Sequence, residues 1–394
     1  MITPDPDFRP NANRAVYVQG KIDQQLVDRL TPEIISLKSQ NSDPITVYID
    51  SPGGSVVLME TLLSLLTASD QDTTKPCRLI TVVTSRAASA AADLLSSGDY
   101  ALAYPGTTLL YHSARVSQEG PLTFEWTSLL VQYLRESSGT YATKLAQNIV
   151  DRFMFRFVTS KDQFDEVRKK DPKQTTDLDC FLTLISENLS APARRVLENA
   201  KARYRRYDDL LEWVVKRSKG RGSKTDAEYE AVQIKAIVDF EVRSNRKRKD
   251  WSFEGGGLNS LTDDFFLLNE YLGNYISGFF RRLCLRYGHF LLDDNQNEAL
   301  DNAPPAEKAN QKVEKVQALL LPIWSFFVAL CHALQHGEND LTARDACWLG
   351  LIDEVIGEVG MPSRRLASEY TPDPTPKQSK DEPHKPTPKR KATQ

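Results

Sequence analysis

The chain has 394 residues, more than one ordinary domain holds, so a core domain with an additional module is expected. Hydrophobic residues make up 40% and charged residues 26%, as in a globular protein, and the formal net charge of -3 excludes a general electrostatic attraction to nucleic acid. The five cysteines are far apart and include no C-x-x-C pair, which argues against a zinc site or disulfide framework and favours a cytoplasmic location.

The sequence supports neither a signal peptide nor a membrane-spanning helix. The N-terminal residues contain no apolar segment of the kind found in signal peptides. The most apolar run, Ala318 to Leu334, includes Pro322 and His332, and a bilayer needs about 20 consecutive apolar residues. We interpret this run as a buried core helix, and we expect no membrane contact and no cofactor.

Strand and helix patterns alternate in the first third of the chain. Short β-rich runs are expected at 15–19, 45–49, 79–83, 100–103 and 107–111. Helical patterns follow the first three of these runs, the third of them from Ala87 to Leu95. This alternation is typical of βαβ units and predicts an α/β fold with a parallel sheet.

The character of the sequence changes after residue 116. A long amphipathic helical stretch is expected from Leu122 to Phe157, with a break at Gly139. Residues 158–312 are expected to form an α-helical insertion. Their basic clusters alternate with acidic residues, as on a solvated helical surface, so nucleic acid is not the expected partner.

The remaining boundaries follow from composition. The core is expected to occupy residues 14–157 and to resume at 313–359, with a long apolar helix and a last strand from Leu351 to Ile356. Residues 360–394 are rich in Pro, Lys and Asp and are expected to form a disordered tail.

Three features between Ile45 and Val116 could take part in catalysis. A serine nucleophile needs a base, N–H donors for the developing oxyanion and a group that orients the base. Ser89 stands among very small residues at the expected start of a helix, where the N–H of Ala90 points to the same place. Gly53 and Gly54 follow a strand and could supply the second N–H donor. His112 ends another strand and could reach the same sheet edge.

Each feature has a purely structural explanation when taken singly. A serine among alanines usually packs a helix, Pro-Gly-Gly usually forms a turn, and a lone histidine at a strand end is usually a hydrogen-bonded polar residue. Their order and spacing together favour a functional interpretation.

The combination of motifs resembles a known family. Ser51-Pro52-Gly53-Gly54, Ala87-Ala88-Ser89 and Leu110-Tyr111-His112 are similar to the motifs of the Clp protease proteolytic subunit, within the ClpP/crotonase superfamily. Val16 to Asp23 and Gly350-Leu351-Ile352-Asp353 resemble its first strand and its C-terminal G-L-I-D. The resemblance implies a ClpP/crotonase-like spiral of βαβ units with an inserted α-helical module.

The resemblance also implies a serine-type endopeptidase that cleaves peptide bonds through an acyl-enzyme. Ser89 would be the nucleophile and His112 the base, while Gly53, with Gly54 beside it, and Ala90 would form the oxyanion hole. Peptides or proteins would be the substrates and the chain would form a homo-oligomer. Because no P-loop motif is present, any ATP-driven unfolding would come from a separate ATPase or adaptor.

Two departures from the family pattern concern the site. The position of the family's catalytic aspartate falls at Leu334, and Glu338 and Asp340 are the nearest acids. Ser85-Arg86 replaces the usual Gly-Gln, which would bring a charge close to the site.

These departures keep two alternatives open. One is a catalytically weak or inactive scaffold or regulatory subunit whose helical insertion binds a partner. The weaker one is an acyl-CoA enzyme of the crotonase type, which would not need Ser89 and His112 as a pair.

Overall fold

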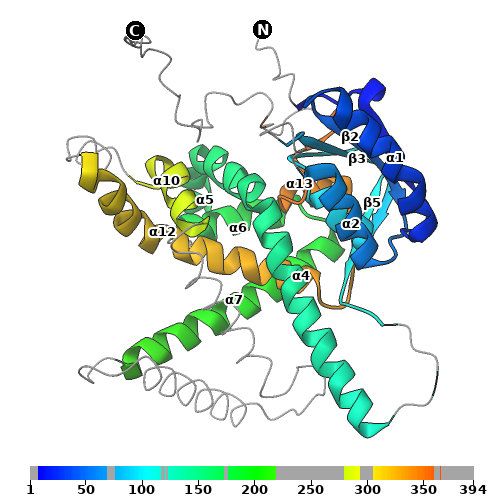
Figure 1. Ribbon diagram of the computed structural model, residues 1–394. Helices are drawn as coiled ribbons and strands as arrows, with labels where there is room; N and C mark the ends of the chain where they lie inside the picture. Colours follow the sequence, from blue (N-terminus) through cyan, green and yellow to red (C-terminus); the bar gives the residue numbers. More distant parts are fainter. Residues whose placement is uncertain are drawn as a thin grey trace, which may run out of the picture.

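The computed structural model describes residues 8–68, 76–116, 120, 123–172, 176–218, 279–292, 305–358 and 364. Figure 1 shows a sheet with helices α1 and α2 on it, next to a group of helices that α4 joins to the sheet. The expected insertion (158–312) and tail (360–394) lie partly outside the described residues.

The elements have the following bounds. The strands are β1 Ala15–Gln19, β2 Ile45–Ser51, β3 Leu79–Ala88, β4 Tyr100–Ala103, β5 Thr108–His112, β6 Glu338–Thr342 and β7 Glu354–Val355. The α-helices are α1 Gln24–Gln40, α2 Val56–Thr67, α3 Ala90–Ser96, α4 Phe124–Thr159, α5 Phe164–Lys170, α6 Asp177–Asn188, α7 Ala191–Ser218, α10 Phe279–Leu291, α12 Pro305–Leu334 and α13 Ala343–Trp348.

The strands form one seven-stranded sheet. Its main path has the order β1-β2-β3-β4-β7, with parallel neighbours throughout. β3 is long because it has two partners on one side: Ile80–Val83 pair with β4, and Arg86–Ala88 pair with β5. The α/β fold of βαβ units that the sequence predicted is therefore confirmed.

Three expectations about the secondary structure were wrong: the start of one helix, a break in another, and the absence of a strand. α3 begins at Ala90 instead of Ala87, because the preceding residues pair with β5. α4 runs through Gly139 without a break; this glycine is buried, so packing offsets its low helix propensity of about 1 kcal/mol. β6, which no strand pattern indicated, pairs antiparallel with β5.

Side-chain caps explain where the first helices begin. The carboxylate of Asp23 accepts a hydrogen bond from the Leu26 N–H at 3.1 Å at the start of α1. The hydroxyl of Ser55 does the same for the Leu58 N–H at 3.3 Å at the start of α2. Ser89 precedes α3 in the corresponding position, but its hydroxyl makes no capping bond, so it remains available for another role.

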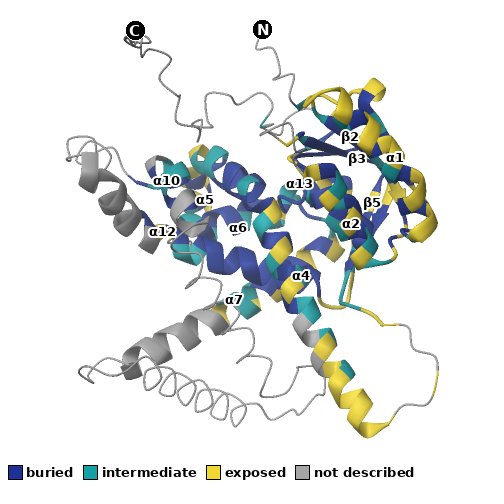
Figure 2. Cartoon of the chain, viewed as in Figure 1, coloured by how far each residue is buried: buried dark blue, intermediate teal, exposed yellow. Residues whose placement is uncertain are grey.

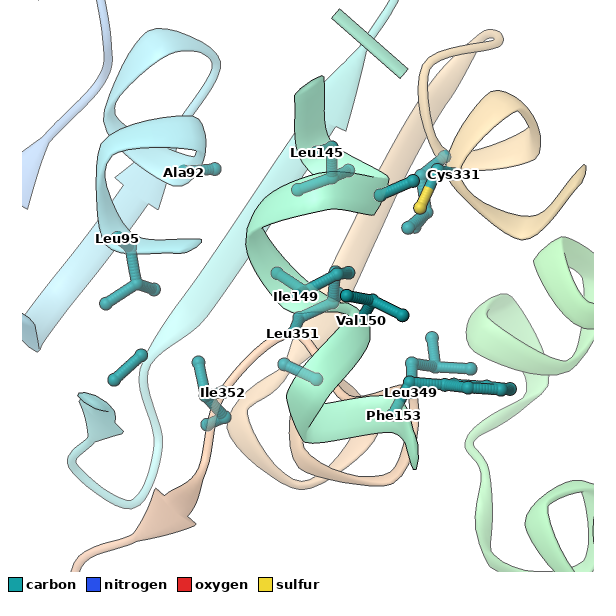
Figure 3. Packing of buried hydrophobic residues seen from close by; sticks show 14 of the residues in the cluster. Ala92, Leu95, Leu145, Ile149, Val150, Phe153, Cys331, Leu349, Leu351 and Ile352 are labelled. Carbon is teal, nitrogen blue, oxygen red and sulfur yellow. The ribbon is translucent and has the colours of Figure 1, made fainter. Parts of the chain in front are cut away.

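The C-terminal part of the chain packs into the same core as the N-terminal part. Figure 3 shows side chains of α4 lying between α3 and the segment that follows α13. The labelled residues are Ala92, Leu95, Leu145, Ile149, Val150, Phe153, Cys331, Leu349, Leu351 and Ile352. Most residues in the C-terminal half of α4 are buried or half-buried, with Lys144 and Asn148 exposed, whereas its N-terminal end is largely exposed (Figure 2).

A buried ion pair fixes the return of the chain to the sheet. The carboxylate of Asp353 accepts hydrogen bonds from Arg152 Nε and from the Ala101 N–H, both at 2.8 Å. Arg364 also pairs with this carboxylate. Burial alone would raise the pKa of Asp353, but the charges of Arg364 and Arg152 outweigh it and hold that pKa below its usual value. The pair ties α4 and β4 to the C-terminal segment.

The apolar run of α12 lies inside the protein. Phe326, Phe327 and Leu330 in its second half are fully buried, as expected for a core helix. Within the described ranges, no helix combines the length and apolar character required to cross a membrane.

Candidate active site

A cavity of about 530 Å³ opens at the carboxyl ends of β2, β3 and β5. Such a strand edge is the usual place for a site in parallel sheets. Side chains and backbone from widely separated positions meet there. The lining includes Gly54, Ser89, Ala90, Asp93, Tyr111, His112, Arg115, Tyr141 and Gln335. The structure thus brings Ser89, Ala90, Gly54 and His112 to one cavity.

Ser89 occupies a strained turn between β3 and α3. Its φ of 57° makes it the one non-glycine residue with positive φ in the part of the chain that the structure describes. The backbone on both sides holds it there: its N–H donates to the Leu110 carbonyl at 2.8 Å, and its carbonyl accepts from the Ala92 N–H at 2.8 Å. Such a conformation costs about 1–3 kcal/mol and concentrates at functional sites. The residue is partly exposed toward the cavity.

The two glycines have different roles. Gly53 is buried with φ 90°, and its N–H donates to Ser51 Oγ at 3.1 Å. A Cβ at this position would lie 2.4 Å from the Ala88 carbonyl oxygen and 2.7 Å from Ser89 Cβ, so Gly53 lets the loop after β2 approach the serine turn. Gly54 is exposed and lines the cavity, and no hydrogen bond among the described residues uses its N–H.

The two glycines differ in whether their N–H groups are already hydrogen-bonded. The Gly53 N–H is already bonded and Gly53 does not line the cavity, whereas Gly54 has a free N–H there. Ala90 also lines the cavity, and as the first residue of α3 its N–H has no acceptor within the helix.

His112 lies at the end of β5, two residues beyond the Leu110 that pairs with Ala88. Its Nδ1 is 2.7 Å from the main-chain carbonyl oxygen of Ser113. Because a carbonyl can only accept, this contact places a proton on Nδ1, so that in the neutral ring Nε2 is the nitrogen able to accept a proton.

No carboxylate of the described residues forms a hydrogen bond with the His112 ring. Glu338 lies opposite His112 in the β5–β6 register, but its carboxylate pairs with Arg115. Asp340 lies opposite Leu110 and is exposed, and Leu334 is fully buried. The position that an acid holds in the usual triad is taken here by a main-chain carbonyl.

Arg86 and Asp93 lie in places that the sequence motifs did not predict. Arg86 is exposed on β3 and does not line the cavity, so the charge expected near the site is absent from it. Asp93 does line the cavity, although no motif pointed to it. The signal available in the sequence was its spacing, because a residue four positions after Ser89 lies on the same face of a helix.

The fold and this arrangement define an α/β protein with a serine at a strained strand-to-helix turn and a histidine in the same cavity. Residues 9–136 match the family model described as Clp protease, so this part of the chain is a Clp protease domain, and a helical region follows it. A comparison with curated proteins gives no match.

Proposed function

We propose that the chain is a ClpP-like serine endopeptidase with Ser89 as nucleophile and His112 as general base. The observation that carries the proposal is the strained conformation of Ser89 at the wall of a cavity that also contains His112. Strain at a single serine is difficult to explain by packing, because an alanine-rich helix start needs no positive φ.

The reaction follows from the groups at the cavity. His112 Nε2 takes the proton of Ser89 Oγ as the oxygen attacks the substrate carbonyl carbon. The N–H groups of Gly54 and Ala90 donate to the carbonyl oxygen as it becomes negative. The imidazolium then gives its proton to the leaving amine, and a water molecule, deprotonated by His112, hydrolyses the acyl-serine ester.

The Ser113 carbonyl has a specific effect on this chemistry. In a complete triad the aspartate fixes the tautomer and orientation of the histidine and also stabilises the imidazolium. The Ser113 carbonyl would supply the first of these two effects. A neutral carbonyl stabilises the imidazolium less than a carboxylate does. We therefore expect slower turnover than a complete triad gives, with a dyad mechanism intact.

The same proposal includes partners and organisation. The N-terminal half of α4 carries exposed apolar side chains, of which Trp126, Leu129 and Tyr133 share one face of the helix. A second copy of the chain would bury this face in a homo-oligomer, and a separate ATPase or adaptor would deliver protein substrates. We assign residues 14–157 and 313–359 to the peptidase core and 158–312 to an inserted helical module.

One observation favours a second candidate, a catalytically weak scaffold. His112 lacks an acidic partner among the described residues, and the helical region after residue 136 offers additional binding surface. In that case the cavity would bind a peptide segment without cleaving it.

Covalent labelling separates these candidates. A fluorophosphonate probe should label the wild-type protein at Ser89, identified by peptide mass spectrometry, and Ser89→Ala should remove the label. Ser137→Ala is the matched control, because Ser137 also lines the cavity and its loss should leave labelling unchanged. Unlabelled Ser89 in folded wild-type protein, shown by a cooperative melting transition, would support the scaffold instead.

A further inference from the structure

Asp93 places an acidic group in the wall of the Ser89 cavity. It lies four residues after Ser89 on α3, which corresponds to about 6 Å along the helix axis. Asp93 and Tyr141 line both this cavity and a second one of about 330 Å³ between α2 and α4. A side chain that enters from a peptide bound at Ser89 would therefore meet the Asp93 carboxyl at the boundary of the two cavities.

This carboxyl has no cationic partner. Its recorded side-chain contact is a long hydrogen bond from Gln335 Nε2 at 3.4 Å, and no ion pair of the described residues includes Asp93. Lys144, which lines the second cavity with Asp93, pairs with Glu60. Lys144 is thus committed to another carboxylate and offsets the charge of Asp93 only from a distance.

The surroundings make a bare carboxylate costly. The pKa of Asp93 is raised to about 7: burial is the main cause and the charge of Glu60 adds to it, whereas the Gln335 hydrogen bond and the charge of Lys144 act in the opposite direction. The groups that face Asp93 come from every element around it: Glu60 on α2, Tyr111 on β5, Tyr141 and Lys144 on α4, Cys331 on α12, and Gln335. An incoming cation would relieve this cost, because an opposite charge favours the ionised carboxylate.

We propose that the Asp93 carboxyl, at one helical turn from Ser89 in a shared cavity, selects peptides with lysine or arginine on the N-terminal side of the cleaved bond. Leu58 and Leu134 on the cavity wall provide apolar contact for the aliphatic stem, and the Asp93 carboxylate accepts from the cationic head. The inference rests on the proposed peptidase function and adds its substrate class.

Two fluorogenic peptides that differ at this one residue test the selection. One carries lysine and the other norleucine, which has a similar stem without the ammonium group. Wild-type kcat/KM should favour lysine by about 10- to 100-fold at pH 8.5. In Asp93→Asn the preference should fall to about 1, whereas Asp340→Asn, which removes an exposed carboxylate that lines neither cavity, should keep it.

The pH dependence of the ratio supplies a second readout. Asp93 is neutral below its raised pKa, so the lysine preference should grow as the pH rises through about 7. Equal rates for the two peptides in wild-type protein, or a loss in Asp93→Asn that is the same for both, would overturn the selection.

Binding to Ser89→Ala separates this inference from the proposed function. Calorimetric titration should show tighter binding of the lysine peptide than of the norleucine peptide, and Asp93→Asn in the same background should remove the difference. If wild-type protein cleaves neither peptide while this difference persists, the peptidase proposal fails and cation recognition stands. If both peptides are cleaved but bind equally, the peptidase stands and the cation selection fails.

Discussion

Replacement of Gly53 by alanine tests whether the loop after β2 must touch the serine turn. A Cβ at position 53 would lie 2.4 Å from the Ala88 carbonyl oxygen and 2.7 Å from Ser89 Cβ. Carbon atoms in ordinary contact keep about 3.5 Å or more from their neighbours. The backbone next to Ser89 therefore has to move by about 1 Å, and both atoms in its way belong to the turn that carries the nucleophile.

The magnitude has two parts that can be separated. An alanine at positive φ costs about 1–2 kcal/mol, and overpacking adds about 1–3 kcal/mol. Gly106→Ala is the matched control, because Gly106 has φ 81° and nothing within 4 Å of its Cβ position, so it carries the first cost alone. We expect Gly53→Ala to lose about 2–5 kcal/mol of unfolding free energy and Gly106→Ala about 1–2 kcal/mol.

The substitution should also lower activity in the molecules that remain folded. A misplacement of about 1 Å at a reacting group can cost about 100-fold in rate. Fluorophosphonate labelling rates of Ser89 in Gly53→Ala, Gly106→Ala and wild-type protein, with urea unfolding of each, measure both effects. If Gly53→Ala is labelled as fast as Gly106→Ala, the close contact between Gly53 and the Ser89 turn has no role in positioning the serine.

Three further outcomes are expected. Glu338→Gln and Asp340→Asn should each change the labelling rate less than about threefold, because a main-chain carbonyl orients His112; a loss near the 10⁴-fold of a missing triad acid would contradict this assignment. Asp353→Asn should lower the unfolding free energy by about 3–5 kcal/mol, measured in urea, because it leaves the buried Arg152 without its partner; a loss below about 1 kcal/mol would contradict a structural role for the pair. The pKa of Asp353 is lower in the folded protein than its unfolded value of about 3.9. The stabilisation that the ionised carboxylate provides is therefore fully present above about pH 3.9 and is lost as the pH falls from there through the folded-state pKa, which urea unfolding of the wild-type protein at decreasing pH checks. Light scattering at micromolar concentration should show an oligomer that a charged substitution at Leu129, on the exposed apolar face of α4, dissociates, and a wild-type monomer would exclude the assembly.

Local sequence pattern was sufficient to predict the first five strands of the sheet and the order in which the motifs follow one another along the chain. The runs at 45–49 and 79–83 are apolar almost throughout, which only a strand covered on both faces allows, and both form central strands. The small residues around Ser89 are required by a sharp turn, and the glycines after β2 by a close approach of two backbone segments. Both requirements restrict the residue type at those positions, so they are visible in the sequence.

What the sequence did not contain is the pairing between distant segments. The antiparallel β6 strand exists because its residues pair with β5, more than 200 positions earlier in the chain. The contacts of His112 with Ser113 and of Gly53 with Ser51 join near neighbours, but they depend on the backbone conformation that the fold imposes. Asp93 became a site residue because α2, α4 and the segment after α12 enclose it. Sequence determines the parallel strands and the turn, since these follow from side-chain size and polarity along the chain. Tertiary structure decides which groups become partners and which are buried, because both depend on segments that meet only when the chain has folded.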